Sequence, residues 1–401
     1  MWWKKRRIYL DYASATPVSA AARSATLKTM DVFGNPGSIH ADGVIAKKSL
    51  QDSRERIAQS LACKPREVVF VSGGTEANNL AILGFARRLE ATTRTLKETH
   101  WVVSAIEHPS VLECFAEVER LGGSVSYVEP DPQSLIRAET LEKVLKPETV
   151  FVSIGWANHE IGTVQKISEL SRVIHVHEKK YGSIVLFHTD AGQAPLFKSP
   201  HVHTLGVDLF SLDSGKLYGP RGVGVLFISE RAELASTLFG GRQERGLRPG
   251  TENIALAAGF AAAIEELVSE RTEEKKRLKE IRSDLTKKIA TVSDIILNGD
   301  SERTLPNLIN ISIKNVDTEY LTLALDRDGI SVATKSACRE GEESRSPVID
   351  ALLKASHSTQ SWRSENTLRI SMGKGTKAGD IEIAFLCLKK NILLLRQKKM
   401  V

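Results

Sequence analysis

The stretch Ile184-Val185-Leu186-Phe187-His188-Thr189-Asp190-Ala191-Gly192-Gln193 runs from apolar residues into an acidic turn that contains glycine. A similar arrangement occurs at Val207-Asp208-Leu209-Phe210-Ser211-Leu212-Asp213-Ser214-Gly215-Lys216, where the apolar residues lead to a lysine. Short apolar runs of this length are typical of strands that are buried on both faces of a sheet. We therefore expect two buried strands here, each ending in residues that carry charge.

Comparable runs lie on both sides of these two segments. Apolar stretches occupy residues 68–71, 101–103, 150–154 and 223–228, and helical patterns occupy 76–90 and 167–180. Alternation of strands and helices indicates an α/β layer, with a mostly parallel sheet flanked by helices. We place this larger domain at residues 16–263.

The pattern changes after Thr251. Residues 254–290 have apolar side chains at helical spacing and predict one long or broken helix that joins two domains. Apolar and polar residues then alternate at 309–313 and 368–372, as expected for a sheet with one face in water. These features predict a smaller α+β domain made of residues 1–15 and 264–401.

The composition argues against several classes of protein. Hydrophobic residues make up 41% and charged residues 26% of the 401 residues, unlike a disordered, collagen-like or disulfide-stapled chain. No apolar run reaches the ~18 residues of a membrane span. The net charge of +6 is concentrated at the two ends, without a basic stripe that is interleaved with aromatic residues. We therefore expect no membrane partner and no direct nucleic-acid partner.

The cysteines are far apart and form no Cys-x-x-Cys pair; they are Cys63, Cys114, Cys338 and Cys387. We therefore expect neither disulfides nor a zinc ribbon, and we expect a cytoplasmic location. Two histidine pairs, at 175/177 and 201/203, lack a third ligand at useful spacing, so no metal site is expected.

Cys338 differs from the other cysteines because charged residues surround it. Lys335 and Arg339 favour its thiolate, whereas Glu340 and Glu342 oppose it. The stretch 332–369 is rich in Ser, Glu, Arg and Gly and predicts a loop that can move. We expect Cys338 to be reactive and the other three cysteines to be small buried hydrophobic residues.

Ligands gather at the carboxyl ends of strands in open α/β sheets, and three kinds of group follow the predicted strands. Ser72-Gly73-Gly74-Thr75 opens a helix whose N–H groups favour an anion, with a plain N-capped turn as the alternative. Asp190, if buried, needs either a pyridinium nitrogen or a structural partner. Lys216, in a rigid turn, is either a surface charge or an amine that is desolvated for Schiff-base chemistry. His108 follows another strand, and a hydrogen-bonded core histidine is its alternative.

Taken together, the motifs resemble the cysteine desulfurases, which are pyridoxal-phosphate enzymes of the class V aminotransferase family with fold type I. The similarity runs over nearly the whole chain. The motifs that carry it are Tyr9–Pro17, Phe33–Ser38, Ser72–Glu76, Glu107–His108, Asn158–Gly162, Asp190–Gln193, Lys216–Pro220, Arg248–Thr251, Ser336–Cys338 and Leu368–Ser371.

This resemblance implies the cofactor pyridoxal 5'-phosphate and a role for each matching residue. Lys216 would bind the cofactor as a Schiff base, Asp190 would keep its pyridine nitrogen protonated, and His108 would stack on its ring. The other implied cofactor contacts are Gly74 and Thr75 at the phosphate, Gln193 at the phenolic oxygen, His159, Ser214, and Thr251 at the phosphate of a neighbouring subunit.

The substrate implied by the resemblance is L-cysteine. Arg369 would bind its carboxylate as a bidentate fork, with Asn35 and Asn158 nearby. Cys338 would take the sulfur as a persulfide, leave alanine, and pass the sulfur to an acceptor protein for iron–sulfur cluster, thio-cofactor or tRNA synthesis. The contact from Thr251 implies a homodimer with shared active sites.

Three positions depart from the family pattern. Asp213 and Gly215 stand where the family usually has a small hydroxyl and a histidine near the phosphate, and His159 replaces an asparagine. An aspartate that faces the phosphate would repel it, so Asp213 must point away or the cofactor binds less tightly. Ser214 could supply the missing hydroxyl.

Two other functions stay open from the sequence. One is another lyase or aminotransferase of the same family, such as a selenocysteine lyase-like enzyme, which would not need Cys338. The other is a catalytically weakened relative that serves as a scaffold, for which Asp213 and Gly215 are the motivation.

Overall fold

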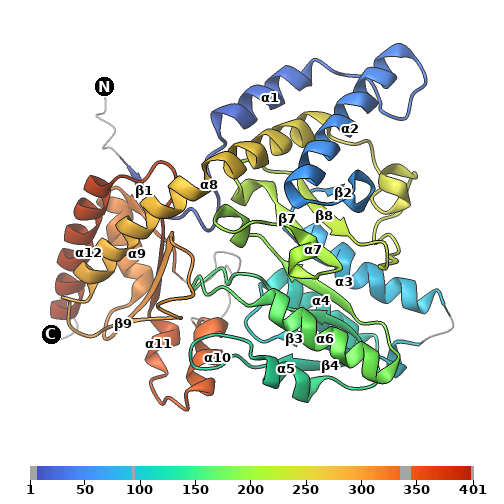
Figure 1. The fold of residues 1–401 in the computed structure, drawn as a ribbon. Helices are drawn as coiled ribbons and strands as arrows, with labels where there is room; N and C mark the ends of the chain where they lie inside the picture. The colour runs from blue at the N-terminus through green and yellow to red at the C-terminus, as the bar shows by residue number, and fades with distance from the viewer. Residues whose placement is uncertain (1–6, 93–94, 335–344, 399–401) are drawn as a thin grey trace.

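A seven-stranded sheet forms the core of the larger part of the chain in the computed structural model, which describes residues 7–92, 95–334 and 345–398 (Figure 1). The strand order is β2-β8-β7-β6-β5-β3-β4, and β8 runs antiparallel to its neighbours β2 and β7, whereas the pairs from β7 to β4 are parallel. The strands are β2 Val68–Val71, β3 His100–Ser104, β4 Ser124–Val128, β5 Thr149–Ser153, β6 Leu186–Asp190, β7 Leu209–Asp213 and β8 Gly224–Ile228.

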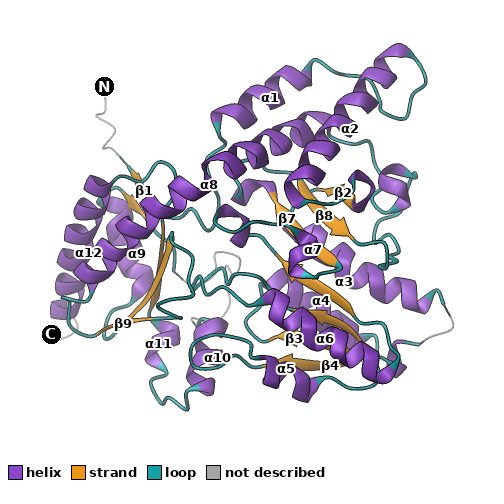
Figure 2. Ribbon diagram, in the orientation of Figure 1, coloured by secondary structure: helices purple, strands orange, loops and turns teal. Residues whose placement is uncertain are grey.

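Helices cover both faces of this sheet, which is why its inner strands read as continuous apolar runs (Figure 2). Alternate residues of β2 enter different cores: Val69 and Val71 pack with residues of α3 and α4, and Val68 and Phe70 pack with residues of α2, α6 and α8. The helices of this part are α1 Ala20–Met30, α2 Ala41–Leu61, α3 Gly74–Glu90, α4 Pro109–Arg120, α5 Ala138–Val144, α6 Ile167–Tyr181 and α7 Val202–Leu205.

The helix α8 runs from Ile254 to Ile289 without interruption and connects the two parts of the molecule (Figure 1). Its first half is rich in small apolar residues that pack against α1 and α2. The predicted boundary at residues 263/264 therefore falls inside a continuous helix. In its second half, Arg277 donates to the carbonyl oxygens of Gly373 and Thr376, and Arg282 donates to that of Leu308.

The smaller part contains a three-stranded antiparallel sheet of order β12-β10-β9 and a parallel pair of β1 with β11. The β1–β11 pair joins the first described residues to the C-terminal part of the chain. The elements are β1 Ile8–Tyr9, β9 Ile295–Leu297, β10 Leu308–Ile313, α9 Thr318–Arg327, β11 Ile330–Ser331, α10 Pro347–Ala355, α11 Trp362–Glu365, β12 Thr367–Ser371 and α12 Ala378–Lys398.

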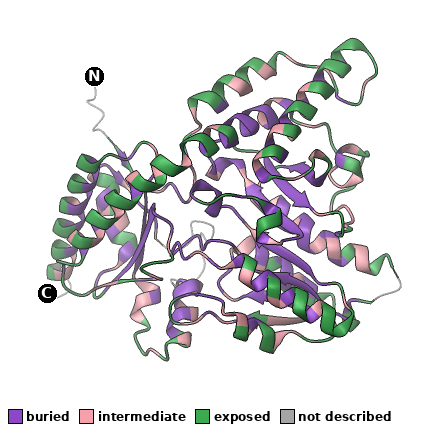
Figure 3. Cartoon of the chain, in the orientation of Figure 1, coloured by how far each residue is buried: buried purple, intermediate pink, exposed green. Residues whose placement is uncertain are grey.

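The prediction that this smaller sheet has one face in water was wrong. Every residue of β10 and β12 is buried, and much of the strand ribbon in Figure 3 has the colour of buried residues. Hydrogen bonds allow the polar side chains of β10 to be buried. The amide nitrogen of Asn310 donates to the carbonyl oxygen of Glu160, and the Ser312 hydroxyl donates to the carbonyl oxygen of Arg363. Alternation of polar residues here reflects contact with the larger part and with α11, not with solvent.

The predicted loop at 332–369 is helical in part. Ser346 caps α10 by accepting a hydrogen bond from the Ile349 N–H, and Pro347 occupies the first helical position. Both signals are typical helix starts. Among the described residues, no helix is both long enough and apolar enough to cross a membrane.

Candidate active site

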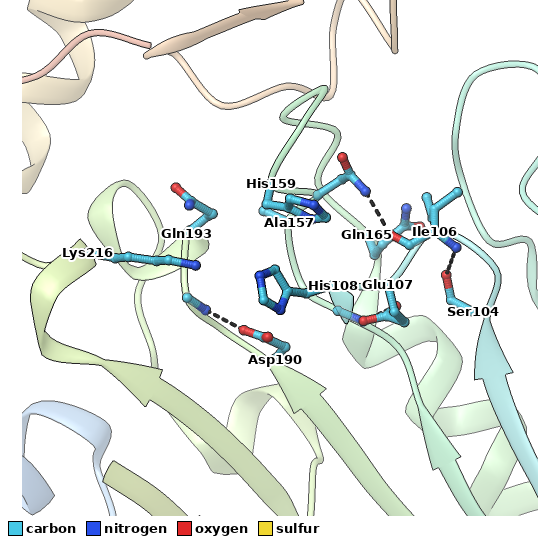
Figure 4. A pocket seen from close by; sticks show the side chains of 13 residues that line it. Ser104, Ile106, Glu107, His108, Ala157, His159, Gln165, Asp190, Gln193 and Lys216 are labelled. Carbon is cyan, nitrogen blue, oxygen red and sulfur yellow. Dashed lines mark hydrogen bonds between the residues drawn. The ribbon is translucent and has the colours of Figure 1, made fainter. Parts of the chain in front are cut away.

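A pocket lies where the carboxyl ends of β3, β5, β6 and β7 meet, as the parallel sheet requires (Figure 4). Its wall brings together six of the residues that the sequence predicts for the site: His108, Asn158, His159, Asp190, Gln193 and Lys216. Residues far apart in the chain thus share one small volume. No group of three or more His, Cys, Asp or Glu side chains within the described ranges could hold a metal ion.

Asp190 ends β6, and its carboxylate is half-buried. Its Oδ2 accepts a hydrogen bond from the amide nitrogen of Asn78 at 2.8 Å, and its Oδ1 accepts one from the Gly192 N–H at 2.9 Å. Burial alone would raise the pKa of Asp190, but Lys216, His108 and these two donors outweigh it and hold the pKa below its ordinary value. The pocket therefore contains a fixed negative charge.

Lys216 faces the same pocket from the short 3-10 turn Ser214–Lys216 that follows β7. The hydroxyl of Thr16 braces this turn, because it donates to the carbonyl oxygen of Gly215 and accepts from the Tyr218 N–H. One buried side chain thereby binds the backbone within the turn and just after it. The amine of Lys216 is presented on a rigid support.

His108 lies between Asp190 and His159 in the pocket (Figure 4). It caps α4, and its Nδ1 accepts a hydrogen bond from the Ser110 N–H at 3.1 Å. Burial and the nearby Lys216 lower the pKa of His108 to about 4. The ring of His159 meets it edge to face at 5.1 Å between centroids, and burial together with His108 lowers the pKa of His159 as well. Both rings are therefore neutral near pH 7.

The glycine-rich turn before α3 is faced by Asp213. The Oδ2 of Asp213 accepts a hydrogen bond from the Gly74 N–H at 3.1 Å. Asp213 thus does not point away from the predicted phosphate position. Ser214 is fully buried. Its Oγ lies against Gly219, because a Cβ atom on that glycine would be only 2.1 Å away.

Gln193 lines the pocket, and Arg369 lies next to it through a contact with His159. The amide nitrogen of Gln193 donates to the carbonyl oxygen of Ala13, and its Oε1 is buried without a partner among the described residues. Arg369 is 3% exposed. Its guanidinium donates to the carbonyl oxygen of His159 at 3.0 Å and to the Asp11 carboxylate at 2.9 Å.

Six of the predicted residues that the structure describes do not line the pocket: Asn35, Gly74, Thr75, Ser214, Thr251 and Arg369. Asn158 lines it, but its amide braces the following turn: Oδ1 accepts from the Glu160 and Ile161 N–H groups, and Nδ2 donates to Ile106. Asn35 and Thr251 are exposed and lie outside the pocket. Cys338 lies outside the described residues.

Two buried polar residues of the site were not predicted. Asn78, one turn into α3, orients Asp190, and only its position four residues after Gly74 could have indicated that it faces the pocket. Glu107 precedes His108, and its Oε1 accepts from the Gly155 N–H at 2.7 Å. Burial, with Asp190 nearby, raises the pKa of Glu107 to about 8.

A mostly parallel central sheet, a long connecting helix and a lysine that shares a pocket with a half-buried aspartate define a fold type I enzyme of the pyridoxal-phosphate class. The family model "Aminotransferase class-V" matches residues 8–383, and the chain belongs to that family.

Relatives of this chain include cysteine desulfurases and NifS-like proteins. Cysteine desulfurase IscS of Dictyoglomus turgidum is 36% identical over 397 residues, which cover 98% of this chain and 96% of the relative. A NifS-like protein has a similar structure, with a TM-score of 0.87 and 28% identity over 97% of this chain and 100% of that one. SspA, in complex with cysteine, matches with a TM-score of 0.75 and 30% identity over 91% of this chain and 98% of that one.

Proposed function

We propose that this protein is a cysteine desulfurase that uses pyridoxal 5'-phosphate. It removes sulfur from L-cysteine, so that the carbon–sulfur bond breaks, a sulfur–sulfur bond forms on Cys338, and the carbon takes a proton to give L-alanine. The observation that carries the proposal is the lysine–aspartate pair in one pocket, Lys216 opposite Asp190. The similarity to IscS of Dictyoglomus turgidum over nearly the whole chain supports the substrate.

The residues present in the pocket fit the ring of this cofactor. Asp190 is a half-buried carboxylate of the kind that pairs with a protonated pyridine nitrogen, and two donors already fix its orientation. Lys216 supplies an amine for covalent attachment, and His108 supplies a neutral flat ring. The buried Gln193 Oε1, which lacks a partner among the described residues, marks a polar edge of the same space.

The cofactor, when bound, would supply an electron sink for the α-carbon as it loses its proton, which assists cleavage of the bond between the neighbouring β-carbon and sulfur. The side chain of Lys216 lines the same pocket as Asp190, so its amine is placed to move a proton there. His108, whose pKa is lowered to about 4, is neutral and can accept a proton without first losing one. His159 and Gln165 form part of the wall of the same pocket.

Arg369 is proposed to bind the substrate carboxylate. It is buried at the boundary between the two parts, and its Nε has no hydrogen-bond partner among the described residues. The contacts to Asp11 and His159 hold the guanidinium plane in place, which suits recognition of a planar carboxylate. SspA, a relative in structure, is found in complex with cysteine.

The exposed position of Thr251 supports a homodimer with shared active sites. Thr251 lies in a hollow with Ser72 and Arg248, next to the glycine-rich turn. A residue of this kind can complete the cofactor site of a second copy. We also propose that an acceptor protein takes the sulfur from Cys338, for iron–sulfur cluster, thio-cofactor or tRNA synthesis, and that the enzyme works in the cytoplasm.

The decisive experiment measures alanine release from L-cysteine by the purified protein after it is loaded with pyridoxal phosphate. We expect one alanine for each sulfur that is transferred to a thiol acceptor. Turnover of other amino acids with no alanine from cysteine would favour a lyase or aminotransferase of the same family. Absence of cofactor binding would favour a scaffold.

A further inference from the structure

Asp213 occupies a space that two glycines leave open at the start of α3. A Cβ atom on Gly73 would lie 3.4 Å from the Asp213 Oδ2, and a Cβ on Gly74 would lie 3.3 Å from the Asp213 Cβ. The carboxylate extends from the end of β7 into this space and accepts the hydrogen bond of the Gly74 N–H. The aspartate is therefore seated on the helix terminus itself.

The start of α3 is a strong position for one anion. The N-cap residue Gly73 has no side chain that could cap the helix. The N–H groups of the first turn of α3 and the positive end of the helix dipole can therefore bind another group. Glu76 is already nearby: it accepts from the Ser72 N–H and pairs with Arg248. A phosphate dianion that enters here therefore meets two carboxylates.

The residues on the other side of Asp213 leave it a place to move. Gly215 has no side chain, and a Cβ atom there would lie 3.2 Å from the Asp213 Oδ1 and 3.2 Å from the Arg221 Cγ. The carboxylate and the arginine side chain thus converge on the same gap. Rotation of Asp213 toward Arg221 would free the Gly74 N–H and bring the carboxylate closer to a cation.

We propose that Asp213 is an internal occupant of the cofactor's phosphate position and that it determines the affinity for pyridoxal phosphate. The proposal rests on the cofactor named above. Asp213 caps α3 in the cofactor-free chain and must give up the Gly74 N–H before a phosphate can take it. The enzyme consequently holds its cofactor by the ring and by Lys216, while the phosphate contributes little.

The test compares two probes that differ only in the phosphate. Pyridoxal phosphate and pyridoxal are titrated into cofactor-free wild type, Asp213→Ser and Asp213→Asn, and the visible absorbance of the bound form gives each Kd. We expect the ratio of the pyridoxal Kd to the pyridoxal-phosphate Kd to rise about tenfold or more in both variants, as expected when a like charge a few Å away is removed. Pyridoxal itself should bind all three proteins equally.

A matched control removes an aspartate that caps a different helix. Asp317 accepts from the Glu319 and Tyr320 N–H groups at the start of α9, far along the chain from the pocket. Asp317→Ser should leave both Kd values unchanged. An unchanged ratio in both Asp213 variants, or weaker binding of pyridoxal phosphate by them, would overturn the proposal.

A second measurement needs no cofactor at all. Inorganic phosphate should raise the melting temperature of cofactor-free Asp213→Ser but not that of wild type, because only the variant offers a vacant anion position. Equal effects of phosphate on the two proteins would contradict the proposal. If no protein in the series binds either probe, the proposed cofactor is wrong, and this result is distinct from an unchanged ratio.

Discussion

Asp190 and Lys216 converge on a single glycine, Gly192. A Cβ atom on Gly192 would lie 3.2 Å from the Asp190 Oδ1 and 3.7 Å from the Lys216 Nζ. The glycine backbone also donates its N–H to the same aspartate oxygen. One residue without a side chain therefore spaces the two charged groups of the site.

Gly192→Ala should impair the site without unfolding the protein. The added methyl crowds the Asp190 carboxylate and the Lys216 side chain, so we expect pyridoxal phosphate to bind about tenfold or more weakly. Gly379→Ala is the matched control, because a Cβ atom there meets no other atom within 4 Å. Equal cofactor affinity in the two variants would show that the spacing does not matter.

Lys216→Ala should lower alanine release by roughly a thousandfold or more, since a covalent attachment point and a proton carrier are lost together. Borohydride reduction followed by mass spectrometry should attach the cofactor to the wild type and leave the variant unmodified. Near-normal turnover in the variant would refute the assignment of Lys216.

Asp190→Asn should keep the fold and weaken catalysis. The amide cannot stabilise a protonated pyridine as a carboxylate does, and loss of a charged hydrogen bond corresponds to about ten- to a hundredfold in rate. Circular dichroism should remain native while the rate of alanine release falls. Global unfolding would instead mean that Asp190 is mainly the structural partner of Asn78.

Cys338→Ser should bind the cofactor and L-cysteine but form no persulfide. Burial raises the pKa of both Cys63 and Cys114 to about 12, so these thiols are protonated at neutral pH and do not compete. Intact mass spectrometry with and without reductant should find the labile sulfur on the Cys338 peptide. Cys387→Ser is the control and should keep both activity and label.

Glu107→Gln should change how stability depends on pH. Because burial raises the pKa of Glu107 to about 8, the folded chain keeps a proton that the unfolded chain releases above about pH 4.3. The bound proton therefore adds to the free energy of unfolding at about pH 5, and this added stability is lost as pH rises to about 8. The glutamine variant lacks it, so denaturant titrations should show a smaller decline than in the wild type. Parallel curves would contradict a protonated Glu107.

The sequence predicts the inner strands and the pocket well because both rest on strong local signals. Asp190 and Lys216 follow short, mostly apolar stretches, and the carboxyl ends of parallel strands meet at one edge of the sheet. The edge strand β4 was missed because residues 124–127 are partly exposed and mixed in character, so no apolar run marks it. Strand β9 was also missed, because it has only three residues.

What the sequence misses is the side-chain contact between distant elements. Nothing in the sequence shows that Asn158 braces a turn, that Ser214 packs against Gly219, or that Asp213 caps α3. Each of these depends on the direction of a side chain at a tight turn. Periodicity reports which face of an element is buried, but it does not report which polar group finds which partner.

The continuous helix α8 couples the unfolding of the two parts of the molecule. Ala261 and Ile264 in its first half and Leu285 and Ile289 near its other end belong to one hydrophobic core cluster that contains residues of both parts. Helix formation is cooperative, so loss of packing at one end of α8 would fray the segment that packs at the other end. The molecule should therefore melt in one transition, and a chain break inside α8 should split that transition into two.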